Sequence, residues 1–264
     1  MFNAETLTDM LENQAKNLEV YTYESVTSTN DLAKEFAQKN PNKEAVIIAS
    51  EQTAGRGRRG RAFFSPGKTG LYMSIVLRPA FSPELVSLLT PCAALCVADA
   101  IEQVSSKSTE IKWINDVYIK GKKVSGILCE SSFTSGMNPL EYVIIGIGIN
   151  LSTPILGFPS EIKNIATSVY GDNIPNALEI QTLCSSIINR ICCYSSKLDK
   201  RDFLSAYKNK LCMIGCEIDV ISQSQTYVAK AVDIDDNAHL IVALHNGEHV
   251  VLDAGEISIR KKEC

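Results

Sequence analysis

The run GRGRRGR at residues 55–61 is the part of the sequence best suited to hold an anion. Glycines let a backbone approach a ligand closely, and arginine side chains pair bidentately with phosphate or carboxylate oxygens. A basic run is more commonly a solvated loop, and arginine–glycine segments that bind RNA are usually repeated and disordered. This run stands alone after a short apolar segment, in a chain of formal net charge −4, and therefore favours a local site for a nucleotide phosphate.

A second group of polar residues, KWIND at residues 112–116, precedes Lys123 in a predicted hairpin. In the simplest interpretation its tryptophan belongs to the core and the other residues decorate the hairpin. In the functional interpretation Lys112 offers a positive charge to phosphate and Lys123 reaches a carboxylate. Asp116, with Asn115, would then supply the hard oxygen ligands that Mg²⁺ prefers.

The third motif is GIGIN at residues 146–150, inside an apolar run. Alternate side chains of a strand share a face, so Gly146 and Gly148 leave one face of the sheet bare. Glycine weakens a strand, and its double occurrence suggests the close approach of a ligand or of another backbone. Asn150, at the end of the strand, can serve as a polar ligand to metal or phosphate.

Together these motifs resemble those of the biotin protein ligases, in the same order and at similar spacing, from about residue 25 to residue 260. The shared segments are STN (28–30), QTAGRGRRGR (52–61), FFSP (63–66), KWIND (112–116), KKVSGILCE (122–130), GIGIN (146–150) and GEIS (255–258). The resemblance implies that ATP activates biotin as biotinyl-5'-AMP. The biotinyl group then passes to a lysine of a biotin carboxyl carrier domain, in acetyl-CoA or pyruvate carboxylase.

The resemblance also implies roles for individual residues. Biotin would be recognised by small and polar residues: Ser28, Thr29, Asn30, Gln52, Gly55, Gly126, Gly146 and Gly148. Its carboxylate and the phosphates of ATP would meet positive charges: Arg56, Arg58, Arg59, Arg61, Lys112 and Lys123. Nucleotide and Mg²⁺ would be bound by Asn115, Asp116 and Asn150, the last two as metal ligands. The catalytic set would be Arg58, Lys112, Asp116 and Lys123, with Asp116 the nearest base for the acceptor lysine.

Two positions depart from the pattern of the family. Ile114 stands where members usually have proline, which removes a backbone restraint but no functional group, and we expect little effect. Phe63 stands where many members place a tryptophan against the adenine. A phenylalanine can still stack there, with a smaller surface.

Hydrophobic spacing predicts the elements that must position these motifs. Buried strands are expected at 45–50, 70–77 and 142–151, and a hairpin at 110–117 and 123–130. Apolar residues at helical spacing predict helices at 85–104, 180–192 and 202–211. Pro91 is expected to kink or restart the first of these helices.

From residue 215 onward, short strands separated by turn signals predict a small barrel. We therefore expect two domains, a catalytic one at 1–212 and a barrel at 213–264. The resemblance implies an α+β fold, in which a catalytic domain of the class II aminoacyl-tRNA synthetase type, a mixed sheet flanked by helices, precedes an SH3-like barrel.

Composition excludes several classes of function. The negative net charge argues against a general nucleic-acid binder, and no apolar run approaches the length that crosses a bilayer. The N-terminal residues lack the features of a leader, so we expect a cytoplasmic protein. About 24 residues precede the first motif, too few for the winged-helix repressor domain of many relatives.

The cysteines and histidines complete no zinc-binding pattern. Because family members occur as monomers and dimers, a homodimer stays open.

Three alternatives stay open at this stage. A lipoate protein ligase shares the fold and the adenylation chemistry, although the pairing of GRGRRGR with KWIND favours biotin. A nucleic-acid binding module would use the arginine-rich loop alone and would show a steep salt dependence without adenylation. A biotin-binding protein without activity is disfavoured by the retained Lys112, Asp116 and arginines.

Overall fold

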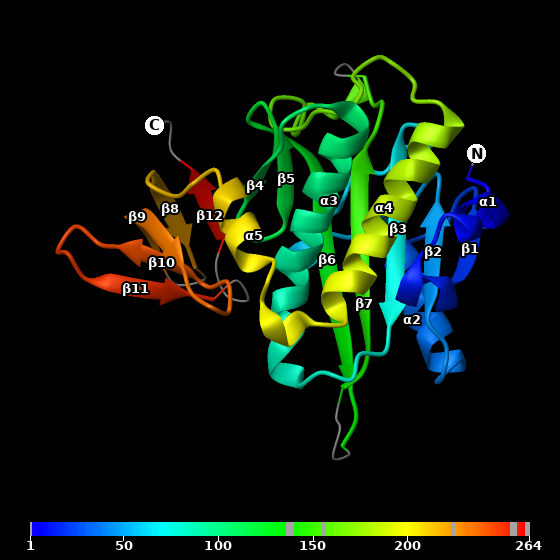
Figure 1. The fold of residues 1–264 in the computed structure, drawn as a ribbon. Coiled ribbons are helices and arrows are strands. Elements are labelled where there is room, and N and C mark those ends of the chain that lie inside the picture. Colours follow the sequence, from blue (N-terminus) through cyan, green and yellow to red (C-terminus); the bar gives the residue numbers. More distant parts are fainter. Residues whose placement is uncertain (1, 136–139, 155–156, 223–224, 254–257, 262–264) are drawn as a thin grey trace.

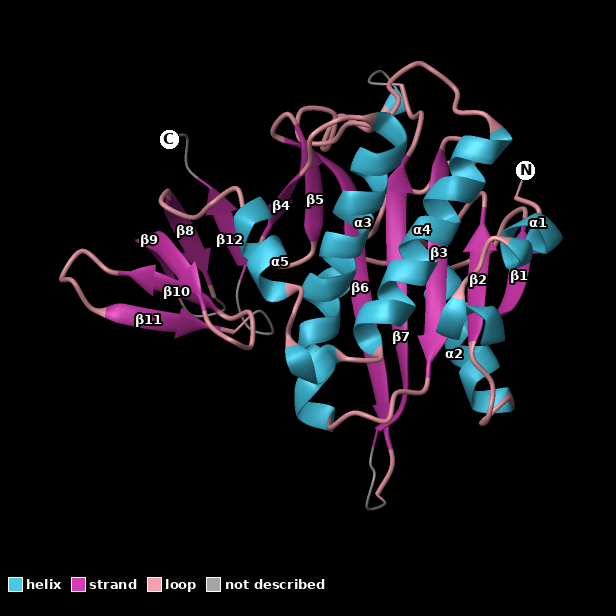
Figure 2. Ribbon diagram, in the orientation of Figure 1, coloured by secondary structure: helices cyan, strands magenta, loops and turns pink. Residues whose placement is uncertain are grey.

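The structure, a computed structural model, describes residues 2–135, 140–154, 157–222, 225–253 and 258–261 of the 264-residue chain. A seven-stranded mixed sheet forms its centre (Figures 1 and 2). Its strands, in spatial order, are β1 (Glu19–Tyr23), β2 (Ala45–Ala49), β3 (Gly70–Leu77), β7 (Leu140–Asn150), β6 (Lys122–Phe133), β5 (Asp116–Ile119) and β4 (Glu110–Lys112). β1 and β2 are parallel, and the other neighbouring pairs of this sheet are antiparallel.

Helices cover both faces of the sheet. The long helices α3 (Leu89–Ser105) and α4 (Ala177–Ser195) lie side by side on one face (Figure 1) and share an apolar cluster with Val46 of β2. Helix α2 (Thr29–Lys39) packs in a separate cluster with Ile47, the next residue of the same strand. Because consecutive side chains of a strand point to opposite faces, α2 lies on the other side of the sheet.

The remaining helices are short. They are α1 (Ala4–Asp9), α5 (Leu204–Lys210) and the 3-10 helices η1 (Asn13–Asn17), η2 (Arg58–Gly60), η3 (Pro83–Leu88) and η5 (Leu198–Lys200). The predicted strands at 45–50, 70–77 and 142–151 and the three predicted helices are confirmed, with small shifts of their ends.

The helical segment Pro83–Ser105 corrects one expectation from the sequence. It is long and apolar enough to cross a membrane by length and composition, although 67% of its apolar window is buried inside the fold. Its apolar character is explained by burial between the sheet and α4. As expected, α3 restarts at Leu89 after η3, which places Pro91 in the first turn, where a backbone N–H is not needed.

The predicted strand at 110–117 is wrong in one respect, because the structure divides it into β4 and β5. Lys112 pairs with Asp116 across a turn made by residues 113–115, and the Trp113–Ile114 peptide bond in this turn is cis. The turn places the KWIND motif at the end of a hairpin. The partner hairpin, β5 with β6, is confirmed.

A second, five-stranded antiparallel sheet follows. Its strands, in spatial order, are β11 (His249–Leu252), β10 (Leu240–Ala243), β9 (Thr226–Ile234), β8 (Glu217–Ile221) and β12 (Ser258–Lys261). It confirms a small β domain at the C-terminal end. Its buried residues, including Ile218 and Val220, belong to the same apolar cluster as the large sheet. The boundary near residue 212 stays a prediction.

Candidate active site

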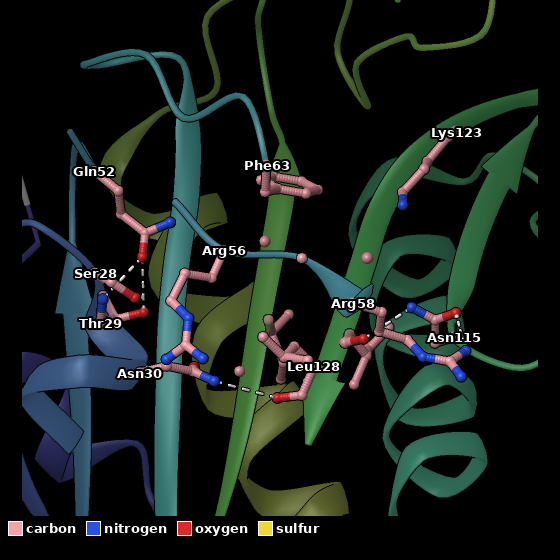
Figure 3. Close-up of a pocket in the computed structure, with 16 residues that line it drawn as sticks. Ser28, Thr29, Asn30, Gln52, Arg56, Arg58, Phe63, Asn115, Lys123 and Leu128 are labelled. Carbon is pink, nitrogen blue, oxygen red and sulfur yellow. Dashed lines mark hydrogen bonds between the residues drawn. The ribbon is translucent and has the colours of Figure 1, made fainter. Parts of the chain in front are cut away.

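A cavity opens on the α2 face of the large sheet, beside the N-terminal end of that helix (Figure 3). Its lining includes residues from each motif singled out between residues 28 and 150: Ser28, Thr29, Asn30, Gln52, Arg56, Arg58, Phe63, Asn115, Lys123, Gly126, Gly146 and Gly148. Residues 255–257 of the GEIS motif lie outside the described part of the chain. The fold thus brings together segments up to about 120 positions apart in the sequence.

One side of the cavity, the polar wall, consists of Ser28, Thr29, Asn30 and Gln52. Ser28 precedes α2 as its N-cap residue, so the next two residues occupy the first helical turn. Gln52 Oε1 accepts hydrogen bonds from Thr29 N at 2.8 Å and Thr29 Oγ1 at 3.1 Å. Its Nε2 donates to Ser65 Oγ at 3.0 Å, which fixes the orientation of the amide.

Ser74 of β3 supports the polar wall through hydrogen bonds, and none of the sequence motifs includes this residue. Its Oγ lies 2.7 Å from Asn30 Oδ1 and 2.8 Å from Thr29 Oγ1, and the residue is fully buried. The signal was present, because Ser74 is the polar residue within the otherwise apolar strand GLYMSIVL. A buried hydroxyl in such a strand requires a hydrogen-bond partner.

The two strand glycines are covered by side chains of the protein itself. A Cβ on Gly146 would lie 2.1 Å from Asn30 Oδ1, and one on Gly148 would lie 2.5 Å from Phe63 Cε1. A close approach to these glycines is therefore observed, but it is made by the side chains of Asn30 and Phe63 and not by another backbone. Approach by a ligand stays a prediction. The space left in the cavity is about 50 Å³, against roughly 300–1,000 Å³ for typical small-molecule sites. A ring placed on these glycines requires the Phe63 side chain to move.

A second cavity adjoins the first and is lined by the cationic wall, which we define as Arg58, Arg59, Arg61 and Lys112. Arg58 Nη1 donates to Asn115 Oδ1 at 3.2 Å, which ties the arginine-rich loop to the KWIND turn (Figure 3). Burial lowers the pKa of Arg58, and the nearby Asp116 carboxylate opposes this shift. The guanidinium stays charged at neutral pH because its ordinary pKa is far above 7.

Lys123 lines both cavities. Its Nζ forms an ion pair with Asp116 Oδ1 at 2.6 Å and lies 5.8 Å from the centre of the Phe63 ring. It therefore stands where the uncharged part of a ligand would end and the phosphates would begin. An amine held in this place can bind a carboxylate and a phosphate at once.

Comparisons with known proteins agree with this geometry. Residues 22–150 match the family described as Biotin/lipoate A/B protein ligase, and residues 213–260 match the Biotin protein ligase C terminal domain. The bifunctional ligase/repressor BirA of Bacillus subtilis (strain 168) is 33% identical over 236 residues, which cover 85% of this chain and 69% of the relative. The chain belongs to the biotin protein ligase family.

Two further relatives support this membership. The biotin--[acetyl-CoA-carboxylase] ligase of Mycobacterium tuberculosis is 30% identical over 239 residues, 87% of this chain and 85% of the relative. The solved biotin protein ligase from Aquifex aeolicus, in complex with biotin and ATP, aligns with a TM-score of 0.77 at 27% identity. This alignment covers 92% of this chain and 99% of that one.

The two residues expected to bind Mg²⁺ in this family member lie apart. Asp116 on β5 lines the second cavity, whereas Asn150 on β7 lies beyond the intervening β6. The Asn150 amide is buried and donates to Thr167 O at 3.1 Å. Among the described residues no group of three His, Cys, Asp or Glu side chains could hold a metal. Asp116 fits as one carboxylate ligand for a cation that takes its other ligands from phosphates and water.

Gly55 also lies outside both cavities, where it serves the loop itself. A Cβ on this residue would lie 2.4 Å from Ser65 Oγ, and Gly55 O accepts a hydrogen bond from Phe63 N at 2.9 Å. The glycine lets the loop fold back on itself and places Phe63 over the sheet.

The KWIND turn is held by residues that the motif does not contain. Tyr207 of α5, fully buried, donates from Oη to Ile114 O at 3.1 Å. Trp113 Nε1 donates to Ala238 O of the C-terminal sheet region at 2.8 Å. These bonds restrain the backbone at the position where the family usually has proline. No pattern in the sequence links Tyr207 to this turn, because the contact arises from packing of distant elements.

Proposed function

We propose that the protein is a biotin--[biotin carboxyl carrier protein] ligase that requires ATP and Mg²⁺. The observation that carries the proposal is the junction of two cavities. One has a wall of mostly buried polar side chains, suited to an uncharged ring with amide-like groups, and the other is lined by arginines and lysines suited to phosphates. Arg58, Asn115 and Lys123 belong to both cavities, which supports a site where the carboxylate of an acid would lie beside the α-phosphate of a nucleotide.

The reaction has two steps. One carboxylate oxygen of biotin attacks the α-phosphorus of ATP, and the bond to pyrophosphate breaks as biotinyl-5'-AMP forms. The amine of the acceptor lysine, after losing a proton, then attacks the acyl carbon, forms the amide and releases AMP. No covalent bond to the enzyme is needed.

The side chains act by position and charge. Arg56, Arg58 and Lys123 bring together a carboxylate and a phosphate, which otherwise repel each other. Arg61, Arg59 and Lys112 stabilise the negative charge that develops on the departing pyrophosphate. Mg²⁺ bound at Asp116 would neutralise further phosphate charge.

Biotin binding in this mechanism displaces the Phe63 ring from Gly148. The ring can then pack against the adenine, since it stands at the border of the two cavities. We place the reaction in the cytoplasm because ATP is its cosubstrate. The acceptor is the biotin carboxyl carrier domain of acetyl-CoA carboxylase or pyruvate carboxylase.

Exchange of labelled pyrophosphate into ATP, driven by biotin, lipoate or octanoate, tests the first step. We expect exchange with biotin alone, lost in Arg58→Ala and kept in Lys39→Ala, which changes an exposed lysine paired with Glu35 at the far end of α2. Exchange driven by lipoate would assign the protein to lipoate ligation instead. Exchange with none of the acids would exclude an adenylating enzyme.

A further inference from the structure

Arg56 is held by two carboxylates from two separate elements. Its Nη1 donates to Asp31 Oδ1 of α2 at 2.7 Å, and its Nη2 donates to Glu130 Oε1 of β6 at 3.0 Å. The sequence motifs assign no role to either carboxylate. The arginine-rich loop is thus fastened on two sides by one guanidinium.

Glu130 uses both of its carboxylate oxygens. While Oε1 accepts from Arg56, Oε2 accepts a hydrogen bond from Asn30 Nδ2 at 2.7 Å. The Asn30 amide is itself fixed by Ser74 and by the room that Gly146 leaves for it. In Figure 3 the Arg56 guanidinium lies directly beside Asn30. A continuous chain of hydrogen bonds therefore runs from the buried strand β3 to the arginine-rich loop.

This arrangement leaves Arg56 able to bind a ligand. Within the described residues, the Arg56 guanidinium uses two of its five N–H donors, in the bonds to Asp31 and Glu130. Three donors are then left for an anion in the cavity that Arg56 lines. The two carboxylates would also repel an anion. However, the Asp31 and Glu130 side chains are 49% and 32% exposed, so solvent screens their repulsion of the anion. The hydrogen bonds that orient Arg56 are kept.

We infer that Glu130, assisted by Asp31, is a positioning residue that holds Arg56 over the carboxylate of the bound acid. The inference rests on the proposed function. It predicts that the acid binds more weakly when the two-sided attachment is lost, while turnover of bound substrates is nearly unchanged.

The chemistry of the two attachments differs. An amide at position 130 offers one acceptor oxygen, so either Asn30 or Arg56 would face an NH₂ group. An amide at position 31 can still accept the single bond from Arg56. Glu130→Gln is therefore expected to raise KM for biotin about tenfold and Asp31→Asn about twofold, with kcat and KM for ATP within about twofold of the wild type.

Steady-state kinetics with the full-length protein test this ranking. Glu141→Gln is the matched control, because Glu141 lies on the neighbouring strand and accepts from Ser132 Oγ at 3.0 Å. Within the described residues its side chain makes no hydrogen bond to the arginine-rich loop. Glu130→Gln in an Arg56→Ala background gives a second test. If Glu130 acts through Arg56, the added change in KM for biotin shrinks to below about twofold, whereas a purely structural effect persists in full.

A measurement that needs no activity separates this inference from the proposed function. Amide hydrogen exchange of residues 53–64 in the ligand-free protein is expected to be about tenfold faster in Glu130→Gln than in the wild type, and unchanged in Glu141→Gln. Equal exchange in all three proteins, or an unchanged or lower KM for biotin in Glu130→Gln, would overturn the inference. If the wild type shows no biotin-dependent exchange of pyrophosphate into ATP, the proposed function is refuted. The attachment of Arg56 by Glu130 would then be decided by amide hydrogen exchange alone.

Discussion

The polar and cationic walls of the site hold their side chains in opposite ways. In the polar wall Thr29 and Asn30 are buried, and each is fixed by side-chain hydrogen bonds to residues on other elements. In the cationic wall Arg59 and Arg61 are exposed on the surface loop. The polar wall is preorganised by the fold, whereas the cationic wall supplies charge on a loop that meets solvent.

This difference matches what each wall must recognise. A neutral ring system offers a few hydrogen bonds, and these discriminate only if the partners are already in place and dry. A triphosphate carries several charges and attracts arginines from any of many orientations. We therefore expect mutations in the cationic wall to affect mostly the binding of ATP and the chemical step, and mutations in the polar wall to affect mostly the binding of biotin.

The largest effect is expected at Arg58, the partly buried arginine of the cationic wall. Its removal leaves the transition-state charge near the α-phosphate without a fixed donor, so kcat for adenylation should fall by about 100-fold or more. Arg59→Ala, on the exposed side of the same loop, should cost less than about tenfold. Pyrophosphate exchange at saturating substrates measures both, and equal losses in the two variants would contradict the division of labour.

The next largest effect is expected at Gly148. An alanine there places its Cβ within 2.5 Å of the Phe63 ring and on the face where biotin must lie. We expect KM for biotin to rise by about 10- to 100-fold with a smaller change in KM for ATP. Gly67→Ala is the control, because its Cβ would meet its nearest neighbour, Glu51 Cδ, at an ordinary 3.5 Å. An unchanged biotin KM in Gly148→Ala would show that biotin does not occupy this face.

The motifs at 52–61 and 146–150 could be predicted from the sequence because one follows and the other ends a mostly apolar strand. The motif at 112–116 could be predicted because it combines a lysine, an asparagine and an aspartate within five residues. The same reasoning missed α2 altogether. The signal existed, since Ser28 and Asp31 precede Leu32 and Phe36 at helical spacing. Hydrophobic periodicity does not predict this helix, because its apolar side consists of four residues, Leu32, Ala33, Phe36 and Ala37.

Other parts of the site lay beyond a reading of the sequence. The glycines at 146 and 148 predict a bare face, but the side chains that cover it come from Asn30 and Phe63, far away in the chain. The turn at 113–115 interrupts residues 110–117, which are predicted to form one strand. It is held by hydrogen bonds from Tyr207 to Ile114 O and from Trp113 to Ala238 O in the C-terminal sheet region. Such contacts depend on packing between distant elements, which periodicity does not encode.

A smaller effect is expected for Ser74→Ala, which removes the support of the polar wall. Asn30 Oδ1 would lose a buried donor, so the free energy of unfolding should fall by about 1–3 kcal/mol and KM for biotin should rise severalfold. Ser125→Ala is a matched control on β6. The Ser125 hydroxyl is also buried but has no hydrogen-bond partner in the described part of the chain, so its loss should not destabilise the protein. Chemical denaturation measures the difference, and similar losses in both variants would contradict the assigned role of Ser74.

The smallest effect distinguishes the walls without mutation. Raising the ionic strength from about 0.05 M to about 0.5 M shortens the Debye length severalfold and screens exposed charges much more than buried hydrogen bonds. KM for ATP, set by the exposed arginines, should rise about three- to tenfold. KM for biotin should rise less than about threefold, because a single carboxylate contributes to its binding and the polar wall does not depend on salt. If KM for biotin rose more with salt than KM for ATP, the recognition of biotin would depend on long-range charge. The polar wall would then support the arginine-rich loop and would not be the part of the site that selects the acid.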